Sequence, residues 1–348
     1  MKKYFPFLLL FVFVVACGVS APPQTQAPVI ENTSLPTEAV QFTPIPTMTT
    51  TPLPTEAFPN FVAITVPPAS GQVAVIRFAS NGTYADVTDT IALGSSKTYS
   101  VNAMKGQIMS VSVLPEIPAG DWGTILMQIK GADGSILCPQ SSDRECLYWR
   151  GALPASQDYF ITLTPNGNIP KFALRVAINP PGKDVQYFQY NNPATGLSLT
   201  YTDSFVPAIP VPGNYKVIPE LTLRLIDAAS YEKTNLGEVY LFVSSTSDAQ
   251  IVPTCAEPNQ GGGGTEQVIG NEVINGYAFV HSNSMGAGAG NYYEQEIYRA
   301  LVDNTCYEVI YYLHSSNIGS YTPGTVTEFD RNAVVQKLYG VFATFIIK

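Results

Sequence analysis

The segment Lys171-Phe172-Ala173-Leu174-Arg175-Val176-Ala177-Ile178 places its large apolar side chains at every second position. A period of two is typical of a β-strand that buries one face. The same alternation occurs in residues 107–113, 124–130 and 158–164, and short clusters rich in Gly, Asn, Asp and Ser separate these segments. Short strands at this spacing, without a helical pattern between them, predict a β-sandwich of jelly-roll type over residues 61–181.

The second half of the chain, residues 182–348, combines strand patterns with one helical pattern. Alternating or β-prone segments predict strands at 197–201, 238–243, 267–273, 277–281, 291–302 and 305–315. Apolar residues then recur every three to four positions, at Phe329, Ala333, Val334, Leu338, Val341, Phe342 and Phe345. That period indicates an amphipathic helix on a sheet. We therefore predict a mainly β chain of two domains, the second being α+β with an antiparallel sheet and a C-terminal helix.

The N-terminus has the features of an export signal. Lys2 and Lys3 precede an apolar run that is too short to span a bilayer but suits a signal peptide over residues 1–16. The sequence Val14-Val15-Ala16-Cys17 resembles the lipobox of bacterial lipoproteins. The resemblance implies cleavage before Cys17, lipid on that cysteine, and an extracytoplasmic chain anchored to the membrane. The alternative is an ordinary signal peptide with an incidental cysteine.

Residues 17–60 have the composition of a tether. Nine prolines alternate with threonines between positions 21 and 60, a composition that favours polyproline II and cannot build a core. The chain carries a net charge of −9 with few Lys and Arg, so we expect no nucleic-acid partner. The same charge would be repelled by anionic lipid, and the membrane contact is therefore expected to depend on Cys17.

Four cysteines remain after Cys17, namely Cys138, Cys146, Cys255 and Cys306. An even number in an exported chain predicts two disulfides, for which three connectivities exist. Pairing within domains, Cys138 with Cys146 and Cys255 with Cys306, is the connectivity we favour. The alternatives are free buried thiols or a metal site, although no CxxC pair or nearby histidine accompanies these cysteines.

Two family resemblances cover most of the folded chain. The residues that carry the first are Arg77-Phe78, the segment from Tyr99 to Gln107, the segment from Trp149 to Pro154, and Asp158-Tyr159. This pattern resembles the bacterial pre-peptidase C-terminal β-sandwich, whose pattern is shared by periplasmic inhibitors of g-type lysozyme. This resemblance covers about residues 73–180 and implies a non-catalytic binding module. Over residues 186–348, the opening from Tyr190 to Tyr201 and the close at Ala343-Thr344-Phe345 resemble PsbP-like domains. That resemblance implies an antiparallel sheet flanked by helices, again without catalysis.

The sequence contains none of the motifs HExxH, GxSxG or GxxxxGK[ST]. We interpret the glycine run at 261–264 and the segment Ser284–Gly290 as loops. Only two histidines occur, His281 and His314, and both lie near the ends of predicted strands. Tyr292, Glu294 and Glu296 share one face of the strand at 291–302. If these strands are neighbours, the histidines and glutamates could converge into a metal site or an acid–base pair of a cryptic hydrolase.

The alternative is that the two histidines are partly buried beside tyrosines and that Glu294 and Glu296 are solvated. Tyrosines such as Tyr292 and Tyr312 could form a platform for a glycan or a peptide, or could pack within the sheet. We predict a non-enzymatic, lipid-anchored binding protein at the cell surface, with a protein or glycan ligand and without a cofactor or metal. The rival functions are inhibition of a cell-wall-degrading enzyme by the first domain and hydrolysis by the second.

Overall fold

A computed structural model describes residues 72–116, 123–139, 147–168, 171–259 and 265–348. The elements in these ranges belong to one compact unit, Glu56–Lys348. The predicted signal peptide, Cys17, the tether, Cys146 and the glycine run at 261–264 lie outside the described residues. In the described part of the chain, no helix is both long enough and apolar enough to cross a membrane.

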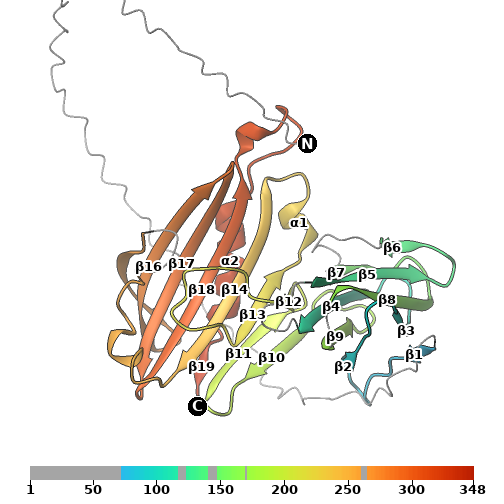
Figure 1. Ribbon diagram of the computed structural model, residues 1–348, viewed down its shortest axis with the longest axis horizontal. Helices are drawn as coiled ribbons and strands as arrows, with labels where there is room; N and C mark the ends of the chain where they lie inside the picture. Colours follow the sequence, from blue (N-terminus) through green and yellow to red (C-terminus); the bar gives the residue numbers. More distant parts are fainter. Residues whose placement is uncertain (1–71, 117–122, 140–146, 169–170, 260–264) are drawn as a thin grey trace, which may run out of the picture. The chain divides into compact units, whose positions relative to one another are not determined.

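The first part of the unit consists of two packed β-sheets (Figure 1). One sheet has the order β1 (Val73–Val75), β3 (Lys97–Ala103), β8 (Gln157–Gly167), β5 (Gly123–Gly131) and β6 (Ile136–Cys138). The other has the order β2 (Tyr84–Thr90), β9 (Lys171–Ile178), β4 (Ile108–Glu116) and β7 (Tyr148–Ala152). The strands pair antiparallel, apart from β1 with β3, which is parallel.

The core of this sandwich is made by the alternating side chains that the sequence indicates. Phe172 and Leu174 on β9 and Val111 on β4 are at most 1 % exposed. Strand β9 has the predicted bounds, whereas β8 continues beyond the predicted end at residue 164 as far as Gly167. This extension pairs with β5, and Gly167 lies opposite Gly123 in the register.

The second part contains a larger antiparallel sheet. Its order is β12 (Phe205–Pro207), β13 (Leu221–Leu225), β14 (Leu236–Thr246), β18 (Thr305–Ser316), β17 (Asn291–Val302), β16 (Tyr277–Gly288) and β15 (Gln267–Ile274). A smaller sheet has the order β10 (Tyr187–Asn191), β11 (Leu197–Thr202) and β19 (Ile346–Ile347). The helices are α1 (Ala228–Tyr231), α2 (Arg331–Phe342) and the short 3₁₀ turns η2 (Val252–Thr254) and η3 (Ile318–Ser320). The predicted fold class, mainly β with antiparallel sheets and a C-terminal helix, is confirmed.

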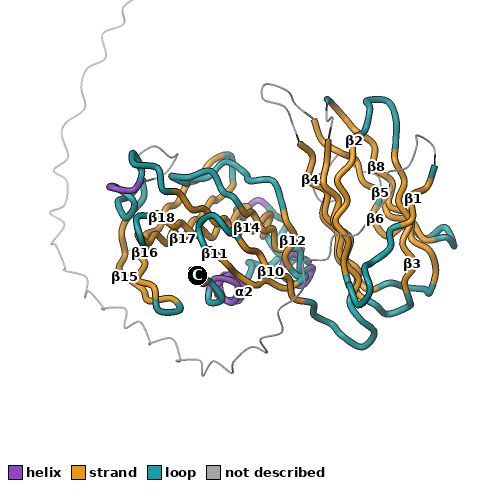
Figure 2. The backbone as a smooth tube through the Cα atoms, turned by 90° about the horizontal axis from the view of Figure 1, so that it is seen from below, coloured by secondary structure: helices purple, strands orange, loops and turns teal. Residues whose placement is uncertain are grey.

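Helix α2 covers one face of the large sheet (Figure 2). Asp330 caps its N-terminus by accepting a hydrogen bond from the Ala333 amide, which satisfies one of the free N–H groups of the first turn. Leu338 and Phe342 are buried, and the Phe342 ring meets Phe279 of β16 edge to face, with centroids 5.0 Å apart. The apolar period in the sequence therefore corresponds to the face that packs on the sheet.

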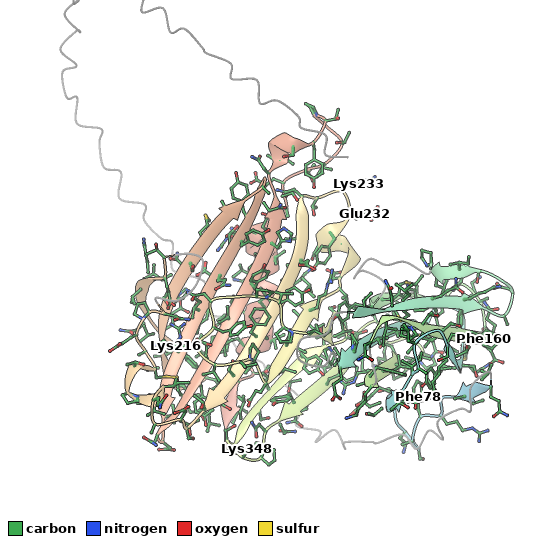
Figure 3. The ribbon with its side chains drawn as sticks, in the orientation of Figure 1. Phe78, Phe160, Lys216, Glu232, Lys233 and Lys348 are labelled. Carbon is green, nitrogen blue, oxygen red and sulfur yellow. A yellow bond between two sulfur atoms is a disulfide. The ribbon has the colours of Figure 1, made fainter. Side chains whose placement is uncertain are left out.

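The segment between β12 and β13 crosses the opposite face of the large sheet (Figure 1). The Asn214 amide donates to Gln295 Oε1 at 3.1 Å, and the Lys216 amide donates to Glu308 Oε1 at 3.0 Å. Lys216, labelled in Figure 3, also donates from Nζ to the Thr254 carbonyl. The sheet is thus buried on both faces over its central strands.

Strand β16 is longer than its sequence indicates. The segment Ser284–Gly290 was expected to be a loop, but residues through Gly288 pair with β17, and only Ala289 and Gly290 form the turn. Both turn residues have positive φ, 49° and 80°, as a two-residue hairpin of type I′ requires. Glycine and alanine extend this strand because the neighbouring β17 supplies the hydrogen bonds, whatever their intrinsic β-propensity.

Polar contacts join the sandwich to the strands that follow it. Arg150 on β7 donates from Nη2 to Asp203 Oδ2 at 3.0 Å, and Asn179 donates to the same oxygen at 2.9 Å. Arg175 on β9 donates to the Tyr201 hydroxyl at 2.7 Å. Strands β1–β9 form the sandwich sheets and β10–β19 the other two. The boundary at residue 181, as a limit between independently folding domains, stays a prediction.

Candidate functional site

His281 lies between two carboxylates on the face of the large sheet that carries α2. Its Nδ1 is 2.7 Å from Glu272 Oε1 on β15, and its Nε2 is 2.9 Å from Glu296 Oε2 on β17. The ring stacks on Tyr298, with centroids 4.1 Å apart. His281 therefore links β15 to β17 through both of its ring nitrogens. Each nitrogen is already engaged by a carboxylate.

Arg331, the first residue of α2, completes this cluster. It donates from Nε to Glu294 Oε2 at 2.7 Å and from Nη2 to Glu296 Oε1 at 2.5 Å. Burial alone would raise the pKa of Glu296, but hydrogen bonds from His281 and Arg331 outweigh burial and hold its pKa below the ordinary value. Glu296 is therefore a carboxylate at neutral pH. The cluster connects an edge strand, a central strand and the helix N-terminus.

The structure brings His281 together with Glu296 but separates both from His314. In the β17 register, His281 pairs with Tyr298 and His314 with Tyr293, five positions apart on one strand. Because side chains alternate between faces, an odd separation places the two histidines on opposite faces of the sheet. The predicted convergence of both histidines with Glu294 and Glu296 is therefore wrong.

His314 has its own partners on the face opposite α2. Its Nε2 is 3.1 Å from Asn291 Oδ1, and its ring stacks on Tyr293 with centroids 4.8 Å apart. Nδ1 lies 3.8 Å from Glu238 Oε2, which is an ion-pair distance but too long for a hydrogen bond. Among the described residues, no group of three or more His, Cys, Asp or Glu side chains is arranged to hold a metal ion.

The two predicted tyrosines also lie on opposite faces. Tyr292 is on the α2 face and is 38 % exposed, which makes it available to a ligand. Tyr312 is 6 % exposed and packs against Tyr240 at a centroid distance of 6.0 Å. The packing alternative therefore holds for Tyr312.

A small pocket lies close to Tyr240. Its volume is about 220 Å³, and its wall includes Thr124, Leu147, Tyr148, Pro210, Val211 and Tyr240. The Tyr148 hydroxyl accepts a hydrogen bond from the Ile209 amide at 3.3 Å. Aromatic rings and prolines thus make the wall stiff and mostly apolar, as is common in ligand pockets.

A buried arginine supports the two tyrosines of this pocket. The Arg224 guanidinium lies 5.2 Å from the Tyr148 ring centroid and 5.7 Å from that of Tyr240, within the range of a cation–π contact. Its Nη1 is 3.5 Å from Glu238 Oε1, to which the Tyr240 hydroxyl donates at 3.2 Å. Because Glu238 also faces His314, a polar network runs from the pocket wall to His314.

A second buried arginine, Arg299, has a fastening role. It donates from Nε to Glu308 at 2.6 Å and from Nη1 and Nη2 to Glu266, and the three side chains are at most 1 % exposed. Glu308 in turn accepts the Lys216 amide of the covering segment. Next to this cluster, Cys255 and Cys306 form a disulfide, as predicted. Cys138 is buried, and because Cys146 lies outside the described residues their pairing stays a prediction.

Sequence reasoning missed Glu272, Arg331, Arg224, Glu238 and the Arg299 cluster. One signal was available for Arg299. If Asp303 and Asn304 form a two-residue turn, the hairpin register places Arg299 opposite Glu308, as observed. The contacts of Arg331 and Arg224 join elements far apart in the sequence, so no local pattern indicates them.

Comparison with known proteins yields structural likenesses only. No protein-family model matches the sequence, and no curated protein matches it. The chain is similar to the crystal structure of PliG, a periplasmic lysozyme inhibitor of g-type lysozyme, from Aeromonas hydrophila, with 21 % identity, a TM-score of 0.25, and coverage of 31 % of this chain and 96 % of that chain. The Salmonella Typhimurium PliG gives 21 % identity, a TM-score of 0.24, and coverage of 32 % and 100 %. A mutant of the Escherichia coli inhibitor gives 21 % identity and a TM-score of 0.23, with coverage of 31 % of this chain and 96 % of that chain. TM-scores of this size do not establish a shared overall fold.

Proposed function

We propose that this chain is a lipid-anchored, extracytoplasmic binding protein that takes one projecting group of a protein or glycan into the pocket at Tyr148 and Tyr240. The observation that carries the proposal is the contact of that pocket with the buried Arg224 and, through it, with the partly buried Glu238. Anchoring rests on the lipobox at Cys17 and the Pro/Thr-rich tether. The Cys255–Cys306 disulfide is in keeping with an oxidising compartment.

The size of the pocket favours part of a larger ligand. Its volume of about 220 Å³ is below the range of about 300–1,000 Å³ that small-molecule sites occupy. A space of this size suits one aromatic or branched side chain, or one sugar ring, while the rest of the ligand stays outside. Tyrosine rings contribute rigid apolar area, and their hydroxyls give such a site a polar tip.

Arg224 gives the proposed site a fixed shape. It is 7 % exposed, and its planar group rests against both tyrosine rings, so that neither ring can turn without losing a contact. Rings that are fixed before binding lose little conformational freedom when the ligand arrives. The non-catalytic part of the proposal rests on the two histidines, since each is engaged by neighbours and neither adjoins a candidate nucleophile in the contacts described above.

A pocket-filling variant tests the proposal. Thr124→Trp puts a large side chain at the pocket wall, while Thr88→Trp puts the same group at an exposed position on β2. Retention of the mature chain on purified peptidoglycan and on a glycan array should fall at least about tenfold for the first variant only. Equal retention of both variants, where wild type binds, would place the ligand elsewhere, and no retention of wild type would leave protein ligands as the class to screen.

The rival function is inhibition of a cell-wall-degrading enzyme. It rests on the sequence resemblance of residues 73–180 to inhibitors of g-type lysozyme. Titrating the mature chain into a g-type lysozyme assay tests it directly, with nanomolar inhibition as the expected sign of that function. The hydrolase alternative is tested by screening ester, peptide and glycan substrates. Turnover that disappears in His281→Ala or His314→Ala would replace the binding proposal.

A further inference from the structure

Strand β15 ends the large sheet and is exposed along nearly its whole length. Figure 2 shows it beyond β16 at the end of the strand row. Val268, Ile269 and Val273 are 52 %, 54 % and 72 % exposed. The strand contains no lysine and no proline, the residues that most often keep such an edge from pairing with another chain. The edge thus combines exposed apolar side chains with a strand border that none of the described strands occupies.

The hairpin that contains β15 shows which backbone groups are free to pair. Asn275 and Gly276 form a two-residue turn with φ of 50° and 89°, so Ile274 and Tyr277 are the closing pair. In such a hairpin the closing pair is hydrogen-bonded, and bonded and non-bonded pairs then alternate along the strand. Val273 and Asn271 occupy non-bonded positions opposite Ala278 and Val280. Their N–H and C=O groups therefore point away from β16, toward the open edge.

The sequence of β15 is self-complementary about Asn271. The residues at equal distances on either side of Asn271 are Gly270 and Glu272, then Ile269 and Val273, then Val268 and Ile274. The last two of these pairs are apolar on both sides. In an antiparallel pair of two such strands, Asn271 would face Asn271 of the second copy and Ile269 would face Val273. A two-fold interface requires this kind of surface, because each patch must bind an identical patch. We propose that β15 pairs antiparallel with β15 of a second copy, which extends the large sheet across a dimer.

Charge selects this register. Glu272 is the single charged residue of β15, and its carboxylate is already paired with His281. In the register centred on Asn271, each Glu272 faces a glycine. A register centred on Glu272 would oppose two like charges, and a slip by one residue would also turn the exposed side chains to the other face. The bulge between Val268 and Gly270 makes Ile269 the extra residue, so the proposed pairing is regular from Gly270 to Glu272 and Ile269 meets Val273 at its margin.

The overall charge limits where two copies of the chain can meet. The whole chain carries −9, so that two copies repel each other except where the contacting surface is nearly neutral. The β15 edge is such a surface, since Glu272 is its single charged residue and the others are polar or apolar, among them Gln267, Asn271 and three exposed apolar residues. This interface is independent of the pocket at Tyr148 and Tyr240.

Site-directed cross-linking of the full chain tests the register. In a bonded antiparallel pair the two Asn271 Cα atoms would lie about 5.5 Å apart, within the range of about 4.4–6.8 Å for a disulfide. Asn271→Cys should therefore give a covalent dimer on mild oxidation, visible on a non-reducing gel and lost on reduction. Val273→Cys is the register control. In the proposed register Val273 faces Ile269 of the second copy, so the two Val273 residues would be offset by four residues, about 13 Å along the strands.

A second pair of variants tests the apolar contact. Val273→Lys, added to Asn271→Cys, should reduce the cross-linked fraction at least fivefold, whereas Ile218→Lys at a comparably exposed position on another segment should not. Urea midpoints close to that of wild type would show that these variants fold. The proposal is overturned if Asn271→Cys stays monomeric while its thiol reacts with a maleimide, or if Val273→Cys cross-links as efficiently. Ligand retention on peptidoglycan, measured on the same variants, reports on the pocket separately.

Discussion

Arg299 Nε donates to Glu308 Oε2 across the β17–β18 hairpin at 2.6 Å, and both side chains are 1 % exposed. The same guanidinium also binds Glu266, so one buried cation faces two buried carboxylates. Two further donors stabilise the Glu266 carboxylate. The Ser282 hydroxyl donates to Glu266 Oε1 at 2.5 Å, and the Asn259 amide donates to Glu266 Oε2 at 2.7 Å. The cluster fastens two covering segments to the sheet.

Removing the cation from this cluster should be costly. Arg299→Leu leaves Glu266 and Glu308 buried without their counter-charge, and we expect the free energy of unfolding to fall by about 3–5 kcal/mol. Urea denaturation followed by tryptophan fluorescence measures the change. Arg77→Leu, at an exposed position, serves as the control and should stay within about 0.5 kcal/mol of wild type. A loss below about 1 kcal/mol for Arg299→Leu would contradict a fastening role.

Glu296 should contribute to stability in a pH-dependent way. Its pKa is below the ordinary value in the folded chain, so its contribution is complete above the unfolded pKa of about 4.3 and is lost as the pH falls through the lower folded value. Glu296→Gln should therefore be less stable than wild type by about 2 kcal/mol at neutral pH. This difference should narrow in acid, below about pH 4.

The control for Glu296 is Glu116→Gln, which breaks the exposed pair between Glu116 and Lys171 at 3.1 Å. An exposed pair contributes little, so its variant should track wild type at every pH. Urea midpoints at a series of pH values separate the two cases. A Glu296→Gln deficit that is the same in acid as at neutral pH would mean that the loss comes from packing and not from the titrating carboxylate.

The disulfide should stabilise the second part of the chain measurably. Cys255 and Cys306 are 51 positions apart, and a loop of this length corresponds to about 2–4 kcal/mol when both cysteines are replaced by serine. Differential scanning calorimetry of the Cys255→Ser/Cys306→Ser variant would show the loss as a lower Tm. Wild type in reductant should behave in the same way, and an unchanged Tm under both conditions would argue against the bond.

Lipid anchoring is tested at the N-terminus. Cys17→Ser removes the acceptor of the lipid, and the chain should move from the membrane fraction to the soluble fraction. Immunoblots of fractionated cells measure the distribution. Ser34→Ala in the tether is the matched control and should remain with the membranes. Sedimentation of Cys17→Ser with the membranes at the wild-type level would rule out the lipoprotein hypothesis.

Regular alternation made much of the fold predictable. The segment that ends at Ile178 and the strand Asn291–Val302 have their predicted bounds, because the side chains of both strands pack in a core. The second half of β16 was missed, since the sequence Gly286-Ala287-Gly288 has no apolar alternation and is a strand by virtue of its neighbours. Local pattern thus predicts strands that bury their own side chains and fails for strands that depend on pairing.

The candidate site was predictable only within a single strand. The common face of Tyr292, Glu294 and Glu296 follows from a period of two, and the structure places all three as expected. The position of His281 beside Glu296 depends on the hairpin turn at Ala289 and Gly290, and the separation of His314 depends on counting that register across two hairpins. Arg331 reaches the cluster because helix α2 packs on the sheet, and no spacing between residues in the sequence indicates that contact.

The bond between Cys255 and Cys306 also sets an order of events. A disulfide forms where thiols are oxidised, so a chain of this sequence held in a reducing cytosol would lack the bond that ties the segment before Glu266 to the sheet. The segment that contains Asn259, whose amide donates to Glu266, would then lack its covalent link to the sheet. For an exported chain this link would form only after translocation, once the cysteines meet an oxidising compartment. Protease digestion of leaderless chain from cytosol, compared with exported chain, should show early cleavage near Cys255 in the former alone.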